Sequence, residues 1–442
     1  MSDNDRDNYF DLDNFDDSLR RDYRDRRADR RPSADNRRPS GRSSAARAAA
    51  ARKRREAQRK RRIRNRAIII CGFVIILALI ILLFSLIIRS CSKGGGEQQQ
   101  QQTTTISTDI MNKQDGGAAT ADEASNELSP TYFKTPNIPD DNTNGYLSYA
   151  IYVWHNTGYE LFGGSQERSK IYADTVNNLA TKLPGVNVYD MIIPNHTEFG
   201  LPQRLKDDDA PSTSQADSMK DAYAALSKDV KAINPYNYLA DHNSEYIYFK
   251  SDHHWTGLGA YYSYKAFADT NKLPALSLKD CTEQVITGFT GTFSNTAEGL
   301  DSDEVHYWEF PYSVTMTITD ESGETQEYDS PYYENATEGS LTYGVFIMGD
   351  NPLTVLRSSS ENAQEGKKIA IVKESYGNAI APYFTNNYEE VHVVDFRYFR
   401  DTVGTDLASY CRENGITDLL FVNGVMSANT QIQLDSMSGL FN

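Results

Sequence analysis

The feature that most constrains this chain is an uncharged run of 22 residues, Ala67 to Ile88, built almost entirely from Ile, Leu, Val, Phe and Ala. A helix of this length, at about 1.5 Å per residue, spans about 33 Å, enough to cross a hydrocarbon core of roughly 30 Å. A signal peptide has a shorter apolar core of about 7–15 residues close to the N-terminus. Because this run is longer and starts after 66 residues, we expect a retained single-pass transmembrane helix over residues 67–88.

The charges that flank the apolar run are strongly asymmetric. Residues 36–66 contain 14 basic side chains and one acidic one, whereas only Arg89 and Lys93 lie close by on the other side. Positively charged flanks stay in the cytoplasm. We therefore expect a cell-membrane protein with a cytoplasmic N-terminus and an extracytoplasmic C-terminal portion, and the lipid bilayer as a partner of residues 67–88.

Two segments beside the apolar run lack the apolar periodicity of a folded core. Residues 1–66 carry 22 Lys and Arg against 12 Asp and Glu and are rich in Ser and Ala, which predicts a disordered basic tail. Residues 89–139 include three successive glycines, five successive glutamines and a threonine run. This composition is typical of a flexible polar linker, so we expect the folded domain to occupy residues 140–442.

The exported portion is strongly acidic, since residues 94–442 carry 21 Lys and Arg against 49 Asp and Glu. Such a field repels polyanions, so we expect no nucleic-acid partner and a neutral or cationic substrate. The chain has four cysteines and no Cys-x-x-Cys pattern, which disfavours a thiol metal site or a redox motif. We expect no metal and no other cofactor, while a disulfide between Cys281 and Cys411 is permitted outside the cell.

Strand-like and helix-like segments alternate through the expected domain. This alternation predicts an α/β fold, with a mainly parallel sheet and helices on both faces. A turn at Asp320 to Gly323 lies within a β-rich insertion, residues 284–345, which either shapes the rim of a site or is a passive elaboration. We expect strands at 146–153, 186–193, 246–250, 368–373, 391–396 and 418–422, and helices at 169–183, 214–233, 258–270, after Ser375, and at 406–414.

The strongest chemical signal is the run Ser-Asp-His-His-Trp at residues 251–255, in a chain with only seven histidines. Asp252 and His254 have the types and spacing of an orienting carboxylate and a general base. In an extended segment His253 points to the opposite face, where it packs or makes a supporting hydrogen bond, and Trp255 packs beneath the histidine. A metal site formed by the Asp-His-His run is an alternative that this extended geometry disfavours.

Ser375 is the best candidate for a nucleophile. It follows the apolar strand Ile369 to Val372 and precedes a helix, so its side chain and the free N–H groups of the helix start point the same way. A serine at such a junction is also a common helix cap. The block Gly-Asp-Asn-Pro at 349–352 resembles a Gly-Asp-Ser nucleophile block, but it carries Asn351 at the serine position and predicts a turn.

Several sequence blocks, in the same order along the chain, resemble the DHHW family over roughly residues 140–440. That family is similar to the SGNH-hydrolase-like domains of alginate acetyltransferases, which transfer acetyl groups to exported polysaccharide. Glu374 departs from the family pattern, where an Asp commonly precedes the serine. The matching blocks are Met191–Pro194, Glu245–Tyr261, Lys373–Ala379, Val394–Tyr398 and Leu419–Val425.

The resemblance implies an SGNH-hydrolase-like, flavodoxin-like sheet in which Ser375 is the nucleophile, His254 the base and Asp252 the orienting residue. It also implies an exported or cell-wall polysaccharide as substrate and a membrane-bound O-acyltransferase as the acetyl donor. Candidates for contacts to an oxyanion or a substrate are Gly291, Asn378, Asn423, Arg397 and Tyr398. For Arg397 an ordinary buried pair with Asp395 is an equally good interpretation.

The sequence therefore predicts a membrane-anchored, extracytoplasmic serine O-acetyltransferase or esterase that acts through an acyl-Ser intermediate. Transfer and hydrolysis share this intermediate, and the sequence leaves both open. The alternative is a non-catalytic glycan-binding or assembly protein of the cell envelope on a hydrolase-like fold, because a fold does not determine a function.

Overall fold

The computed structural model describes residues 128–336 and 339–441. The expected basic tail, the expected transmembrane helix and most of the expected linker lie outside these residues. Within the described ranges, no helix combines the length and the apolar character that crossing a bilayer requires.

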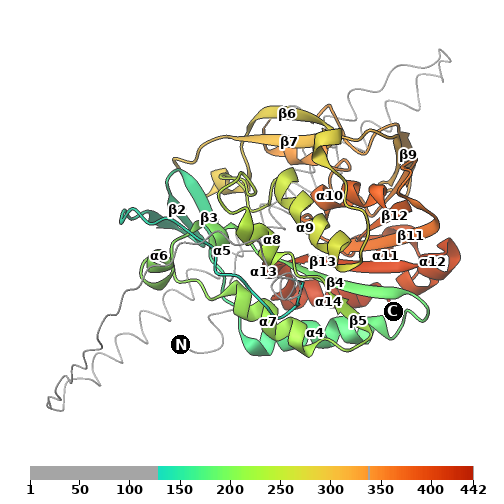
Figure 1. Cartoon of the computed structure of the whole chain (residues 1–442), viewed down its shortest axis with the longest axis horizontal. Helices are drawn as coiled ribbons and strands as arrows, with labels where there is room; N and C mark the ends of the chain where they lie inside the picture. Colours follow the sequence, from blue (N-terminus) through green and yellow to red (C-terminus); the bar gives the residue numbers. More distant parts are fainter. Residues whose placement is uncertain (1–127, 337–338, 442) are drawn as a thin grey trace, which may run out of the picture. The chain divides into compact units, whose positions relative to one another are not determined.

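An eight-stranded mixed sheet carries the described part of the chain (Figure 1). Its strand order is β5-β4-β13-β11-β12-β10-β8-β9. The first five strands are parallel and the last three are antiparallel to their neighbours. The strands are β4 (Asn187–Ile193), β5 (Val230–Ala232), β8 (Val314–Thr319), β9 (Thr325–Tyr328), β10 (Leu353–Ser358), β11 (Gln364–Lys373), β12 (Tyr388–Asp395) and β13 (Asp418–Gly424).

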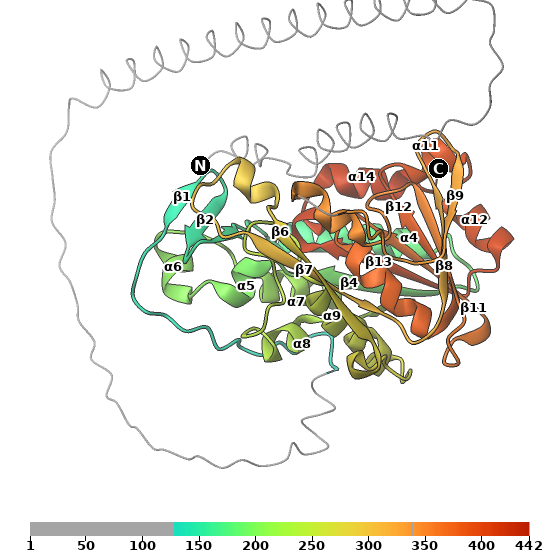
Figure 2. The ribbon, with the colours of Figure 1, turned by 90° about the horizontal axis from the view of Figure 1, so that it is seen from above.

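Helices lie on both sides of this sheet, as the alternating pattern predicted. Figures 1 and 2 show α4 (Gln166–Ala180) and α14 (Gln431–Gly439) on one side and α9 (Gly257–Thr270) on the other. In a flavodoxin-like sheet the last parallel strand of the sequence lies at the edge. Here the last strand, β13, lies between β4 and β11, so the strand order is different. The carboxyl ends of β11, β12 and β13 meet at one edge, where active sites of such sheets form.

Two smaller sheets and several short helices complete the fold. Within residues 284–345, β6 and β7 pair with each other, whereas β8 and β9 extend the large sheet. The remaining elements are β1 (Tyr146–Ser148), β2 (Ile151–Trp154), β3 (Thr157–Glu160), α5 (His196–Gly200), α6 (Gln203–Asp207), α7 (Gln215–Ala225), α8 (Tyr236–Asp241), η2 (Leu278–Asp280), β6 (Thr282–Phe289), η3 (Thr292–Asn295), β7 (Asp303–Glu309), η4 (Gly339–Val345), α10 (Gly377–Ile380), η5 (Ala381–Asn386), α11 (Phe399–Val403), α12 (Leu407–Asn414) and α13 (Val425–Ala428).

Three expected elements differ from the structure. The strand expected at 146–153 is a hairpin of β1 and β2, with Tyr149 in the left-handed region at φ 54° between them. The helix expected at 214–233 ends at Ala225, because Asn177 accepts the N–H of Ser227 and the chain then pairs with β4 as β5. No strand forms at 246–250, where Tyr248 makes an isolated bridge.

The packed domain begins before residue 140. The side chain of Asn237 in α8 accepts the N–H of Lys134 at 2.9 Å and donates to the carbonyl of Tyr132 at 3.0 Å. The last residues of the expected linker therefore lie against α8. Cys281 and Cys411 both carry free thiols in the described domain, so the permitted disulfide between them does not form.

Asp190, on β4, is a carboxyl group inside the core. It is fully buried, and Oδ1 accepts the hydroxyl of Tyr172 at 2.5 Å while Oδ2 has no hydrogen-bond partner. Burial raises the pKa of Asp190 to about 7, although the bond from Tyr172 lowers it. In the unfolded chain the same carboxyl loses its proton near pH 4, so the folded state binds more protons between about pH 4 and pH 7.

We therefore expect the stability that comes from neutral Asp190 to be complete below pH 4 and lost as the pH rises through 7. Asp190→Asn stays neutral at every pH, and its free energy of unfolding at pH 8.5 should exceed that of the unchanged protein by several kcal/mol, on the order of 4. Denaturant unfolding at pH 5 and pH 8.5 measures this difference. The exposed Asp174→Asn is the control, and an equal pH dependence in all three proteins would contradict the expectation.

Candidate active site

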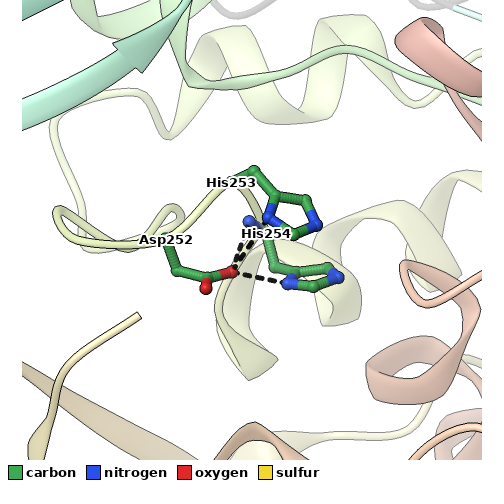
Figure 3. Close-up of side chains that lie close together, drawn as sticks. All are labelled: Asp252, His253 and His254. Atoms are coloured by element: carbon green, nitrogen blue, oxygen red, sulfur yellow. Dashed lines mark hydrogen bonds and ion pairs between the residues drawn. The ribbon is translucent and has the colours of Figure 1, made fainter. Parts of the chain in front are cut away.

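A tight turn, not a strand, carries the Asp-His-His run, and an isolated antiparallel bridge between Tyr248 and Trp255 closes it. The turn brings Asp252, His253 and His254 together (Figure 3), so that one nitrogen or oxygen atom from each side chain lies within 4.8 Å of the other two. The prediction that His253 points to the opposite face is wrong, because the alternation of side chains holds only for extended backbone.

A buried carboxylate, Asp303 at the start of β7, fixes this turn. Its two oxygens accept the N–H groups of Lys250 and Ser251, each at 2.8 Å. The hydroxyl of Ser251 accepts in turn the N–H of Gly291 at 2.9 Å. A Cβ at Gly291 would lie 2.3 Å from that of Asp252, so this close approach requires glycine. The N–H of Gly291, a predicted oxyanion donor, is thus engaged in holding the turn.

Asp252, His254 and Ser375 form one chain of hydrogen bonds. Asp252 Oδ1 lies 2.5 Å from His254 Nδ1, and His254 Nε2 lies 2.7 Å from Ser375 Oγ. Both ring nitrogens are therefore engaged, and the imidazole is oriented between a carboxylate and a hydroxyl. The fold brings together three side chains that the sequence pattern predicted as partners.

Thr292, the first residue of η3, completes the bonds of Asp252. Its N–H and its hydroxyl donate to Asp252 Oδ2 at 2.8 and 3.1 Å. Burial raises the pKa of Asp252, but the charges of His253 and His254, with the bonds from His254 and Thr292, outweigh burial and hold this pKa well below its usual range. Asp252 is therefore ionised at neutral pH and can balance a positive charge on His254.

Glu374 fixes the turn that carries Ser375. Its Oε2 accepts the N–H of Tyr376 at 2.9 Å and lies 3.3 Å from Ser375 Oγ, while Oε1 accepts the N–H of Gly424 at 2.6 Å. Because Gly424 is the last residue of β13, this carboxylate connects the serine turn to the end of the neighbouring strand. Glu374 thus accepts hydrogen bonds from Tyr376, the residue after Ser375, and from Gly424 on the neighbouring strand.

Two aromatic side chains contact the site, Tyr343 at the imidazole of His254 and Trp255 at the serine turn. The ring of Tyr343 in η4 stacks on it, with centroids 4.1 Å apart and planes at 14°, and the Tyr343 hydroxyl donates to the carbonyl of Ser375 at 3.2 Å. Trp255 donates through Nε1 to the carbonyl of Tyr376 at 3.1 Å. Trp255 was expected near the histidine, whereas no motif in the sequence connects Tyr343 with it.

A buried network of charges joins the strand ends that precede the site. Lys373 Nζ lies 2.8 Å from Asp350 and 2.9 Å from Asp395, and Arg397 lies 2.7 Å from both carboxylates. The Asn378 amide also donates to Asp350 at 2.8 Å. Asp350, expected in a simple turn, is therefore a centre of this network, and Arg397 makes the buried pair with Asp395.

The other predicted contact residues are engaged elsewhere. Asn423 donates to the hydroxyl of Tyr172 at 3.0 Å. The ring of Tyr398 lies 5.3 Å from the guanidinium of Arg397. Neither contact involves Ser375 or His254, and a role of Asn423 or Tyr398 at an oxyanion or a substrate stays a prediction.

Removing the Lys373 ammonium should destabilise the fold strongly. Lys373→Met leaves Asp350 and Asp395 buried with one guanidinium between them, and breaking a buried pair costs about 3–5 kcal/mol. The matched control is Lys367→Met on the same strand, whose side chain is 40% exposed and whose ammonium lies 3.7 Å from Asp418, with an expected cost below about 1 kcal/mol. Denaturant unfolding measures both, and equal losses would contradict this assignment.

Comparisons with known proteins found a family model and solved structures of similar fold. A family model described as DHHW protein matches residues 102–394, more than half of the chain. A DHHW family protein from Eubacterium siraeum DSM 15702, solved as a crystal structure, is 28% identical, with a TM-score of 0.60, over 68% of this chain and 98% of that one.

Bacillus cereus PatB1, solved with a sulfonyl adduct, is 20% identical, with a TM-score of 0.53, over 66% of this chain and 98% of that one. At this identity the likeness supports the fold alone. No curated protein sequence matches the chain.

Proposed function

This chain belongs to the DHHW family, and from that membership and the hydrogen bonds among Asp252, His254 and Ser375 we propose that it is a serine O-acetyltransferase or esterase. The contact of 2.7 Å between His254 Nε2 and Ser375 Oγ carries the proposal. A serine hydroxyl is a weak nucleophile until an adjacent base accepts its hydrogen. We also propose that the fold is SGNH-hydrolase-like, as the family resemblance implies.

The proposed reaction has two steps. Ser375 Oγ attacks the carbonyl carbon of the acetyl donor while His254 Nε2 takes the hydroxyl hydrogen and Asp252 balances the imidazolium. The leaving group departs with that hydrogen, and an acetyl ester remains on Ser375. A sugar hydroxyl or a water molecule then attacks this ester through His254, which restores Ser375. Exclusion of water from the site decides between transfer and hydrolysis.

The proposed acceptor is a cell-envelope or exported polysaccharide, and the proposed donor is a membrane-bound O-acyltransferase. The acidic balance of residues 94–442 favours a neutral glycan over an anionic polymer. In this proposal residues 67–88 anchor the chain with its domain outside the cell. Protease added to cells stripped of their wall should digest the domain, and complete protection of the domain would contradict the location.

A chromogenic acetyl ester tests the reaction. Full-length protein in detergent should release the chromophore, and a sulfonyl fluoride should block the release by reacting with Ser375. A chelator should leave the rate unchanged, because both nitrogens of His254 are engaged by Asp252 and Ser375. Release that a chelator abolishes and a sulfonyl fluoride does not would favour a metal hydrolase built on residues 252–254.

One observation favours the non-catalytic alternative, a glycan-binding or assembly protein. Ser375 is 2% exposed and His254 is 4% exposed, so little of either residue faces solvent. Expression of Ser375→Ala or His254→Ala in a deletion strain separates the two functions. Full rescue of the deletion phenotype by both variants would establish the non-catalytic function.

A further inference from the structure

One imidazole of the site has no part in the proposed acyl transfer. His253 is 7% exposed, and its ring centroid lies 3.8 Å from that of His254 with the planes at 37°. Its Nδ1 lies 2.9 Å from Thr292 Oγ1 and 3.6 Å from Asp252 Oδ1. Figure 3 shows the ring of His253 beside Asp252 and His254. The hydroxyl of Tyr376 donates to its backbone carbonyl. Both the backbone and the ring of His253 are therefore held in place.

The direction of these hydrogen bonds follows from the ionised state of Asp252. A carboxylate only accepts hydrogen bonds, so the Thr292 hydroxyl, 3.1 Å from Asp252 Oδ2, gives it its single hydrogen. The same hydroxyl oxygen can then only accept from His253 Nδ1. The hydrogen bonds thus place a hydrogen on His253 Nδ1. They form a relay that runs from His253 through the Thr292 hydroxyl to Asp252.

We propose that His253 is a positioning residue that acts on the general base through Thr292. His253 Nδ1–H donates to Thr292 Oγ1, and this bond fixes the hydroxyl so that its hydrogen points at Asp252 Oδ2. With Oδ2 held by the N–H and O–H of Thr292, the carboxylate presents Oδ1 to His254 Nδ1 at 2.5 Å. This role rests on the proposed function of Asp252 and His254.

The relay gives the two adjacent histidines different tasks. His254 contacts both the carboxylate and the nucleophile, whereas His253 reaches the same carboxylate from the other side, through a hydroxyl. The turn that Asp303 fixes at Lys250 and Ser251 makes this possible, because extended backbone would separate the two rings. Supporting hydrogen bonds of this kind restrict the orientation of a group that takes part in the reaction.

Matched substitutions test the relay in the full-length protein. Thr292→Val keeps the shape and removes the hydroxyl, whereas Thr292→Ser keeps the hydroxyl. His253→Leu removes the ring donor, whereas His253→Asn places an N–H donor near the position of Nδ1. The kcat and KM for acetyl-ester hydrolysis are measured for each variant, and for the double variant His253→Leu with Thr292→Val.

We expect His253→Leu and Thr292→Val each to lower kcat about tenfold with little change in KM, because the loss is in orientation and not in substrate binding. The double variant should be no worse than either single one, since both remove the same relay. Asn at 253 and Ser at 292 should recover most of kcat. A purely structural role in packing would give no recovery by Asn.

Multiplicative losses in the double variant, or no recovery with Asn and Ser, would overturn the relay. Thermal unfolding of every variant checks that it folds, and if His253→Leu does not fold, the isosteric Thr292→Val and Thr292→Ser pair decides the question. Ser375→Ala separates the two proposals. Activity that survives Ser375→Ala refutes the proposed function, whereas an inactive Ser375→Ala beside fully active variants at 253 and 292 refutes the relay alone.

Discussion

Ser375→Ala should abolish acetyl-ester hydrolysis, with a loss of at least about 10³-fold in kcat. The substitution removes the oxygen that lies 2.7 Å from His254 Nε2, and no acyl-enzyme can then form. The side chain of Ser375 is small, and its hydroxyl lies against His254 and Glu374. We therefore expect the variant to fold, with a thermal midpoint close to that of the unchanged protein.

The matched control for this experiment is Ser427→Ala. Ser427 is also a buried serine, in α13 directly after β13, and its hydroxyl has no hydrogen-bond partner. Its removal should leave kcat unchanged. Initial rates with the chromogenic ester measure both variants, and Ser375→Ala with the rate of Ser427→Ala would show that hydrolysis does not depend on Ser375.

Asp252→Asn should lower kcat by about 10³–10⁴-fold while the fold is preserved. An amide at this position keeps one acceptor oxygen in place of two and can place an NH2 group against His254 Nδ1. His254 then carries its hydrogen on Nε2 and cannot accept the hydrogen of Ser375. The low pKa of Asp252 also means that the carboxylate itself does not titrate between pH 5 and pH 8, so an acidic loss of activity in this range has another source.

The control for this variant is Asp301→Asn, a carboxylate that pairs with Lys250 beside the same turn but lies at the surface. Its activity should equal that of the unchanged protein. The kcat of both variants is measured from pH 5 to pH 9. An Asp252→Asn variant with more than about a tenth of the original kcat would show that the carboxylate has no orienting role.

The sequence located the sheet because buried parallel strands are continuous apolar runs. The apolar segments at β4, β11, β12 and β13 lie within a few residues of the predicted ranges. The position of β13 between β4 and β11 could not be predicted, because the lateral order of parallel strands depends on packing between distant segments. The helix expected after Ser375 is divided into α10 and η5, and η5 contains Pro382 in its first turn, as proline allows.

The candidate site was predictable in its residue types and less so in its geometry. Asp252, His254 and Ser375 were recognisable because only a few types of side chain serve as base or nucleophile. The position of the His253 side chain could not be predicted, because the turn that carries it depends on Asp303, which lies 52 residues after Ser251. Thr292 was next to a predicted residue, Gly291, but its contact with Asp252 spans 40 residues and leaves no local pattern.

The most direct test of the account is the site of covalent acylation. Full-length protein is mixed with the acetyl ester, quenched in acid within the first turnover, and digested, and the acetylated peptide is identified by mass spectrometry. The account predicts one acetyl group on Ser375 in the unchanged protein and none there in His254→Ala. Hydrolysis that proceeds with no acetyl group on Ser375, or acetylation of Ser375 that is equal in His254→Ala, would contradict it.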